Sequence, residues 1–300
     1  MHYLVTGGAG FIGSNIAKLL VEKGKNVTVI DNLYRGKLSN LESIIDKINF
    51  HKLDIRNYND IKAVSKNIDG IFHQAALTSV PESYIRSKDY QDVNVHGTEN
   101  IFKIAHELKK KVVYASSSSV YGNTEKIPIK ENFPRNPANP YGQTKLDDEL
   151  LAESYYKKDN MIIGLRYFNV YGIGQNIDYA GVIKKFLENI DKGQPLRIFG
   201  DGNQTRDFVN VLDVSQANLT AMESNIKNGF FNIGTGISTS IISLANIIRD
   251  ISQKPIELIF EDLPHGDVKT SLADISYSRD CLNWVSLISL KDGLKILMNN

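Results

Sequence analysis

Short apolar runs alternate with stretches of helical periodicity through the first half of the chain. The apolar runs, which predict strands, cover residues 3–5, 27–30, 48–53, 71–73, 112–116 and 161–166. From Phe11 to Lys23 the apolar side chains recur at helical spacing, and Gly24 follows where a helix end favours a positive φ. Strands that alternate with helices predict a parallel sheet buried on both faces.

The pattern changes in mid-chain. Four prolines between residues 126 and 140 predict a long loop directly before Tyr141. After Arg166 the alternation weakens, with a helix expected at 182–191 and a strand at 196–199. We therefore expect an α/β fold: a doubly wound parallel sheet (Rossmann) with a smaller, partly interleaved α+β domain. The expected large domain covers residues 1–168 and 207–232, and the smaller one covers 169–206 and 233–300.

A glycine-rich turn follows the first strand. Gly7, Gly10 and Gly13 have the spacing G-x-x-G-x-x-G, with Phe11 and Ile12 before the last glycine. Glycines at such a turn allow a pyrophosphate to approach the backbone, and the helix N-terminus that follows offers unpaired N–H groups. Placed between a strand and a helix, this spacing predicts a dinucleotide-binding loop.

Acidic and small residues follow the next three strands. The second strand ends in Asp31 and Asn32, where a carboxylate can accept both ribose hydroxyls and repel a 2′-phosphate; this favours NAD, with NADP left open by Arg35. Two further pairs at strand ends are expected to contact the cofactor, although each could instead be a plain turn or helix start: Asp54 with Ile55, and Ala75 with Ala76.

The spacing Tyr-x-x-x-Lys occurs three times, at Tyr58/Lys62, Tyr84/Lys88 and Tyr141/Lys145. In a chain with 14 tyrosines the spacing decides nothing by itself. Only the third pair opens a helix after the proline-rich loop and lies downstream of a strand that runs into a serine cluster containing Ser117. On a helix, side chains four residues apart share a face, so this pair predicts an ammonium beside a phenol.

Hydride chemistry on an alcohol needs such a pairing. A free phenol has a pKa near 10, about three units too high for a base that works at pH 7. A cation about 4 Å away at an effective dielectric near 20 contributes roughly 4 kcal/mol, or about three pKa units. Ser117, Tyr141 and Lys145 are therefore the candidate catalytic residues, with Ser117 expected to hydrogen-bond the reacting oxygen.

Composition narrows the class of partner. The chain has 300 residues, 42% of them hydrophobic, and 35 basic residues balance 34 acidic ones. This balance predicts no attraction to nucleic acid or an anionic membrane, and so a small-molecule substrate. No apolar run approaches the roughly 18 residues of a membrane span, and no signal peptide is evident, so a cytoplasmic location is expected. No metal site is predicted. The single cysteine, Cys281, and Trp284 are expected to pack in the small domain.

A set of motifs spans nearly the whole chain. In order they are TGGAGFIGS, DNLYRGK, LDIRN, HQAA, NVHGT, ASSSSVYG, NPYGQTK, LRYFNVYG, FGDGNQTRDFVNVLD and NIGTG. Together they resemble the extended short-chain dehydrogenase/reductase family and, within it, the nucleotide-sugar epimerases, most closely the UDP-glucose/UDP-N-acetylglucosamine 4-epimerases.

This resemblance implies roles for further residues. It places two at the NAD cofactor, which are Asn94 and Tyr167. Around a UDP-sugar it places Ser79, Ser117, Asn169, Val182, Arg206, Asp267 and Ser271. It also implies a homodimer, formed through the helix that carries Tyr141 and the one at about residues 95–108. A small residue at Ser271 implies that 2-acetamido sugars are accepted as well as plain hexoses.

The resemblance also distinguishes between the reactions that members of the family catalyse. In the implied mechanism, Tyr141 takes the proton of the 4-hydroxyl while NAD⁺ takes the C4 hydride, and the hydride returns to the other face after the 4-keto sugar rotates. The family's dehydratases carry acidic residues after the catalytic serine or threonine, whereas this chain has Ser118 and Ser119. Epimerisation is therefore favoured. A UDP-glucuronate 4-epimerase, a nucleotide-sugar reductase and a non-catalytic NAD-sensing module stay open as alternatives.

One position departs from the family. An arginine that usually holds the diphosphate is missing before Gly266 and Asp267, where the chain reads Leu-Pro-His. His265 and Arg197 are candidates to replace it.

Overall fold

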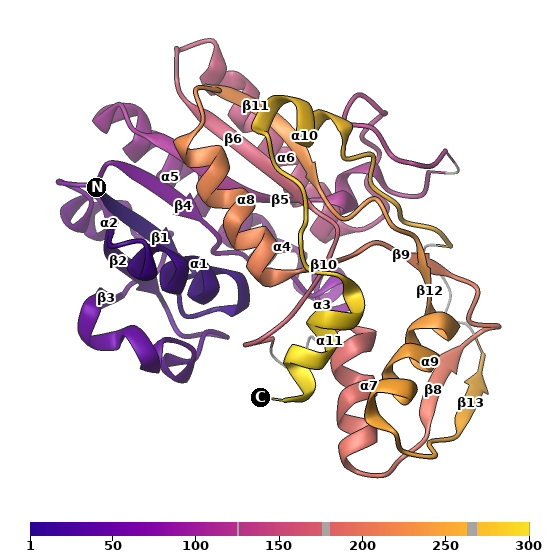
Figure 1. Cartoon of the computed structure of the whole chain (residues 1–300). Helices are drawn as coiled ribbons and strands as arrows, with labels where there is room; N and C mark the ends of the chain where they lie inside the picture. The colour runs from indigo at the N-terminus through magenta and orange to yellow at the C-terminus, as the bar shows by residue number, and fades with distance from the viewer. Residues whose placement is uncertain (125, 176–180, 263–268, 300) are drawn as a thin grey trace.

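Seven parallel strands form the central sheet of the protein (Figure 1). The computed structural model describes residues 1–124, 126–175, 181–262 and 269–299. The strand order is β11-β6-β5-β4-β1-β2-β3. Their bounds are β1 His2–Thr6, β2 Asn26–Asp31, β3 Asn49–Lys52, β4 Gly70–His73, β5 Lys111–Ser117, β6 Ile162–Tyr167 and β11 Asn228–Ile233. The predicted doubly wound parallel sheet is confirmed, and the six predicted strands end within one residue of the observed ones.

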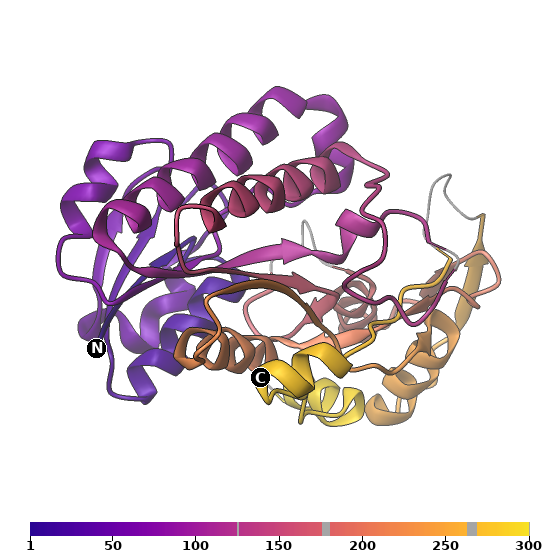
Figure 2. The ribbon, with the colours of Figure 1, turned by 90° about the horizontal axis from the view of Figure 1, so that it is seen from above.

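Helices cover both faces of this sheet (Figure 2). On one face α1 packs against α8, and on the other α2, α5 and α6 lie together. The helices of this region are α1 Phe11–Glu22, α2 Tyr58–Val64, α3 Val80–Ile85, α4 Ser87–Tyr90, α5 Gly97–Leu108, α6 Pro140–Tyr156 and α8 Val211–Glu223.

The strand sequences explain the two layers. Side chains alternate across a strand, and both sets are apolar here because both faces are buried. Tyr3 and Val5 of β1 join the apolar core on the α1 and α8 side. Leu4, between them, joins the core formed with Ile101 and Phe102 of α5.

A smaller unit follows β6 and has a core of its own. Its elements are β7 Asn169–Tyr171, α7 Val182–Asp191, β8 Leu196–Phe199, β9 Thr205–Arg206, β10 Phe208–Asn210, β12 Thr239–Ser240, α9 Ile241–Ser252, β13 Leu258–Glu261 and α11 Leu290–Met298, whereas α10 Ser276–Leu282 packs on β11 of the large sheet. Phe186 and Leu187 of α7 pack against Leu244 and Ile248 of α9. The helix at 182–191 and the strand at 196–199 form at their predicted residues.

The C-terminal region corrects one expectation. Cys281 is exposed rather than packed. Trp284 is buried, but it belongs to the core of the large sheet and not to that of the smaller unit. Its indole N–H donates to the carbonyl oxygen of Asp213 in α8, at 3.2 Å. Trp284 thus attaches the C-terminal segment to α8, one of the helices that cover the large sheet.

Candidate active site

A cleft of about 1070 Å³ opens at the carboxyl ends of the parallel strands. Strand β4 follows β3 in the chain but pairs with β1, so the strand order reverses between β1 and β4. Ligands of open α/β sheets bind at such a point. The predicted site residues that line the cleft are Gly7, Gly10, Phe11, Ile12, Gly13, Asp31, Asn32, Ile55, Ala75, Ala76, Ser117, Tyr141, Lys145, Tyr167, Asn169, Val182 and Arg206.

The glycine turn leaves room for a phosphate group at the start of α1. Gly7 has φ +63°, and a Cβ atom built on it would lie 2.7 Å from the Cα atom of Ala75. A Cβ atom on Gly13 would lie 2.3 Å from the carbonyl oxygen of Gly7. Side chains at these positions would occupy the turn itself. The cradle therefore fits a dinucleotide pyrophosphate at the helix N-terminus.

Asp31 is held by backbone at the end of β2. Its carboxylate accepts from the N–H of Ala9 at 3.0 Å and from the N–H of Leu33 at 2.8 Å. Burial raises the pKa of Asp31, and these two hydrogen bonds oppose the rise. Each carboxylate oxygen has further lone pairs, so the group can also accept ribose hydroxyls.

Of the other residues predicted at the adenosine end of the cofactor, some line the cleft and others do not. Ile55 lines the cleft, whereas Asp54 does not. Asp54 accepts from the Asn32 amide and from Arg56, each at 2.9 Å. The hydrogen bonds from Arg56 hold the pKa of Asp54 well below its usual range. Asp54 thus fixes the orientation of Asn32 in this structure.

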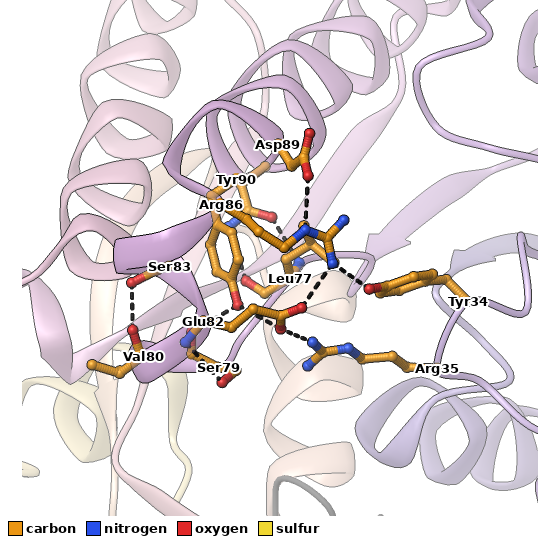
Figure 3. Close-up of polar contacts among 11 residues, drawn as sticks. Tyr34, Arg35, Leu77, Ser79, Val80, Glu82, Ser83, Arg86, Asp89 and Tyr90 are labelled. Atoms are coloured by element: carbon orange, nitrogen blue, oxygen red, sulfur yellow. Dashed lines mark hydrogen bonds and ion pairs between the residues drawn. The ribbon is translucent and has the colours of Figure 1, made fainter.

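Arg35, the residue that left NADP open, forms an ion pair with Glu82 of α3. Glu82 also binds Arg86 at 2.7 Å through its other oxygen. Arg86 continues to Asp89 at 2.8 Å and to the hydroxyl of Tyr34. Figure 3 shows these side chains converging from the loop after β2, from α3 and from the start of α4. The Glu82 cluster, defined as Tyr34, Arg35, Glu82, Arg86 and Asp89, links the two sides of the cleft.

Ser117, Tyr141 and Lys145 come from two neighbouring elements. Ser117 is the last residue of β5, and its Oγ accepts from the N–H of Ser119 at 3.1 Å. The hydroxyl of Ser117 also donates to Ser119 Oγ at 3.0 Å. Helix α6 begins at Pro140, capped by Asn139, so that Tyr141 lies in its first turn and Lys145 one turn further. The two are on one face of the helix.

One buried acid at this site was missed by the sequence analysis. Asp148 Oδ2 lies 3.1 Å from the Nζ atom of Lys145, and both side chains are almost completely buried. The signal was present in the sequence, because residues 141, 145 and 148 follow the i, i+4, i+7 spacing of one helix face.

Behind these residues lies a buried histidine. His73, the last residue of β4, contacts Thr6 Oγ1 at 2.6 Å and Thr98 Oγ1 at 2.9 Å through its two ring nitrogens. Burial, with a smaller contribution from the charge of Lys145, lowers the pKa of His73 to about 3. The imidazole is therefore neutral at physiological pH. It joins the ends of β1 and β4 to α5.

Two residues assigned to the cofactor by resemblance are held by protein groups. Asn94 is completely buried and does not line the cleft. Its amide is paired with both backbone groups of Leu77, at 2.7 and 3.0 Å, and with Thr144 at 3.0 Å. Tyr167 lines the cleft, donates to Gln74 at 3.1 Å and accepts from Asn218 at 2.8 Å.

The residues assigned to the sugar nucleotide are more scattered. Asn169, Val182 and Arg206 line the part of the cleft that faces the smaller unit. Ser79 caps α3 and lies outside the lining, as does Ser271, whose N–H donates to the carbonyl of Thr205 at 3.1 Å. Asp267 and His265 lie outside the described residues. Arg197 lines the cleft and pairs with Glu261 at 2.7 Å.

A comparison with known proteins shows the family of the chain. Residues 3–234 match the family model described as the NAD dependent epimerase/dehydratase family. The chain belongs to this family. NAD is accordingly its cofactor, and the cradle at Gly7 and the carboxylate of Asp31 have the chemistry to hold it.

Members of the family with different sugars are similar to the chain over its full length. It is 41% identical to a putative UDP-glucose 4-epimerase of Methanocaldococcus jannaschii, over 99% of this chain and 97% of that protein. The structure of a UDP-N-acetylglucosamine 4-epimerase from Methanobrevibacter ruminantium, solved with UDP-N-acetylmuramic acid, superposes with a TM-score of 0.94 at 35% identity, over 99% of this chain and 98% of the other. The UDP-glucuronic acid 4-epimerase of Bacillus cereus, solved with its substrate and NAD, gives 0.91 at 32% identity, over 100% and 98%.

The described residues contain neither a cluster of metal-ligating side chains nor a membrane-spanning helix. Among them, no group of three or more His, Cys, Asp or Glu side chains is placed to hold a metal ion. Within the same residues, no helix has the length and apolar character needed to cross a bilayer.

Proposed function

We propose that the protein interconverts UDP-hexoses that differ in configuration at C4, namely UDP-glucose and UDP-galactose and also their 2-acetamido counterparts. The observation that carries the proposal is that Ser117, Tyr141 and Lys145 line the same cleft as the glycine turn. Bound NAD supplies the hydride acceptor and donor for C4. The catalytic residues then have to move only one proton.

The protein's own residues divide that task. Tyr141 takes the proton of the 4-hydroxyl and gives it back when the hydroxyl is re-formed. Lys145, one helical turn away, provides the positive charge that stabilises a phenolate. Ser117 hydrogen-bonds the reacting oxygen and fixes its angle. Ser119, which bonds Ser117, carries no acidic proton for C5 or C6, so elimination of water is disfavoured.

The sugar nucleotide is expected to occupy the side of the cleft formed by the smaller unit. Arg206 is suited to a diphosphate, since a guanidinium binds phosphate oxygens in a bidentate manner. Arg197 is the candidate for a second phosphate contact. We further propose a homodimer through α5 and α6. Leu150, an apolar residue of α6 that is 49% exposed, fits a covered outer face.

The test uses the purified protein without added NAD. UDP-galactose, UDP-N-acetylgalactosamine and UDP-glucuronate are incubated separately, and the products are separated by chromatography. Conversion of the first two at C4 is the expected result. A Tyr141→Phe variant should lose roughly 10³-fold in kcat. Turnover of UDP-glucuronate alone would favour the uronate epimerase, and a need for added NADH would favour a reductase.

Sugar breadth has its own test. Replacing the small side chain of Ser271 with a tyrosine should exclude the 2-acetamido group. Ser271→Tyr is expected to keep UDP-galactose turnover and to lose that of UDP-N-acetylgalactosamine. Equal activity on both sugars would overturn the assignment of Ser271.

A further inference from the structure

Asp148 is a completely buried carboxylate on the reactive face of α6. It lies three residues after Lys145 and seven after Tyr141, so the three side chains follow one another along the helix. Its Oδ2 atom lies 3.1 Å from the Lys145 ammonium. Its Oδ1 atom is buried without a hydrogen bond of normal geometry among the described residues. No step of the proposed reaction uses this acid.

The groups around Asp148 leave Lys145 as its main electrostatic partner. From α5 the Thr98 hydroxyl faces it, and Asp147 of α6 adds a weak repulsion. The charge of Asp148 acts on the Tyr114 phenol of β5, and burial raises the pKa of that phenol so that it stays protonated. From β4, neutral His73 contacts Thr98.

An ion pair projects a weaker field than a lone cation. Lys145 alone would act on the Tyr141 phenol with its full charge, whereas an ionised carboxylate at 3.1 Å cancels part of that field beyond the pair. We propose that Asp148 is a positioning residue that attenuates the charge which Lys145 presents to Tyr141, and so sets the pH at which Tyr141 becomes a base. This inference rests on the proposed function.

The protonation state of Asp148 decides when the attenuation operates. Burial raises the pKa of Asp148 to about 7, against the opposing effect of Lys145. Below neutral pH the acid is uncharged, and the lysine acts with its full charge. Above neutral pH the carboxylate opposes the lysine. Removing the acid should therefore change the enzyme most on the alkaline side of pH 7.

The test compares Asp148→Asn with the unaltered protein and with Asp147→Asn. Asp147 is the adjacent carboxylate on the same helix; it bonds Gln143 at 2.9 Å and Gln91 at 3.4 Å, on the solvent side. The first measurement is kcat against pH on whichever UDP-sugar is turned over. The second is an ultraviolet absorbance titration of ionised tyrosine, in which the same protein carrying Tyr141→Phe is subtracted.

Because Asp148 is ionised only above about pH 7, Asp148→Asn should move the part of the Tyr141 absorbance titration that lies above this pH to lower pH by about one unit, and should move the acid limb of the rate profile in the same direction. Asp147→Asn should leave both in place. Asp148→Ala should shift both in the same direction as the Asn variant, so the proposal stays testable if the Asn variant folds poorly. Superimposable profiles, or a shift to higher pH, would overturn it.

The absorbance titration separates this inference from the proposed function, because it needs no sugar. A protein that converts none of the sugars would refute the proposed reaction. The position of the tyrosine titration in the two Asp148 variants would still decide what Asp148 does to Tyr141.

Discussion

The backbone of Gly7 is in contact with that of Ala75: a Cβ atom on the glycine would lie 2.7 Å from both the Cα and the N atoms of the alanine. Gly7 begins the turn after β1, and Ala75 follows β4, so this contact lies at the bottom of the cleft where the strand order reverses. Neither backbone segment can shift to relieve a clash, because each continues from a central strand of the sheet.

Gly7→Ala should therefore destabilise the fold and weaken NAD binding together. The left-handed conformation costs about 1 kcal/mol or more for an L side chain, and the clash with backbone adds about 2 kcal/mol. Urea unfolding and the NAD content of the purified protein measure the two effects. Gly24→Ala is the matched control, since Gly24 has φ +67° but nothing within 4 Å of its Cβ position. It should lose only about 1 kcal/mol and keep its NAD; equal losses in the two variants would contradict the clash.

A second prediction concerns the buried ion pair beside Ser116, the residue before Ser117. Glu149 of α6 accepts from Arg166 through both oxygens, at 2.8 and 2.7 Å, and from the Ser116 hydroxyl at 2.6 Å. Glu149→Gln would leave the guanidinium buried without its counter-charge and should cost about 3–5 kcal/mol. The measurement is the free energy of unfolding in urea.

The control for this prediction is a glutamate–lysine pair at the surface. Glu188 lies 3.8 Å from Lys192, a side chain that is 62% exposed. Glu188→Gln should change the free energy of unfolding by less than about 0.5 kcal/mol. A loss at Glu149 as small as this would mean that the Tyr121 hydroxyl and the carbonyl oxygen of Glu131, which also accept from Arg166, are sufficient to hold the guanidinium.

The sequence predicted the sheet well because its strands are apolar on both faces. The edge strand β11 was not predicted as a strand. Its sequence begins with Asn228 and Gly229, which are unfavourable in strands, and it is stabilised by pairing with β6 along its length and by burial of Phe231 and Ile233 in the core. Tertiary contacts therefore stabilise a strand that the local sequence pattern does not predict.

Helix α6 shows why part of the site escaped prediction. Its buried residues include Thr144, Lys145, Asp148 and Glu149, so the inward face of its first half is polar. Apolar periodicity marks a core-facing side only where the core is apolar. Lys145 was found through its spacing from Tyr141, but the burial of Asp148 depends on the position of α5 and the sheet, which no local pattern specifies.

A third prediction concerns retention of NAD by the Glu82 cluster. Glu82, on α3, binds Arg35 on the loop that follows Asp31 and Arg86 between α3 and α4, and the two arginine side chains line the cleft. Glu82→Gln removes the charge that joins them, so the loop and helix should separate more readily. Loss of a charge-assisted contact of this kind corresponds to roughly tenfold faster release of NAD. Release is followed by gel filtration of the holoenzyme and chromatography of the retained nucleotide.

Glu107→Gln is the control for Glu82. Glu107 pairs with Lys62 at 2.6 Å, and neither residue lines the cleft. Its NAD release should match that of the unaltered protein. If Glu82→Gln also matches it, the cluster holds the loop without holding the cofactor.

The pKa of Asp148 predicts how stability depends on pH. Burial raises its pKa to about 7 from an ordinary value of 3.8, so the folded protein keeps a proton that the unfolded chain releases between these limits. The stabilisation from this group is fully present below about pH 4 and is lost as the pH rises through about 7. The Asp148→Asn variant has no group that titrates at this position, so it does not lose stability in this way as the pH rises. Its unfolding free energy, relative to that of the unaltered protein, should rise between pH 4 and pH 8 by up to about 4 kcal/mol.

Other groups should not disturb that comparison. His73, whose pKa burial lowers to about 3, destabilises both proteins equally as the pH falls below about 6.5, so its effect cancels in the difference. Asp147→Asn should run parallel to the unaltered protein at every pH. Parallel curves for Asp148→Asn would mean that the carboxylate is charged throughout, because the Lys145 ammonium at 3.1 Å then outweighs the cost of burial.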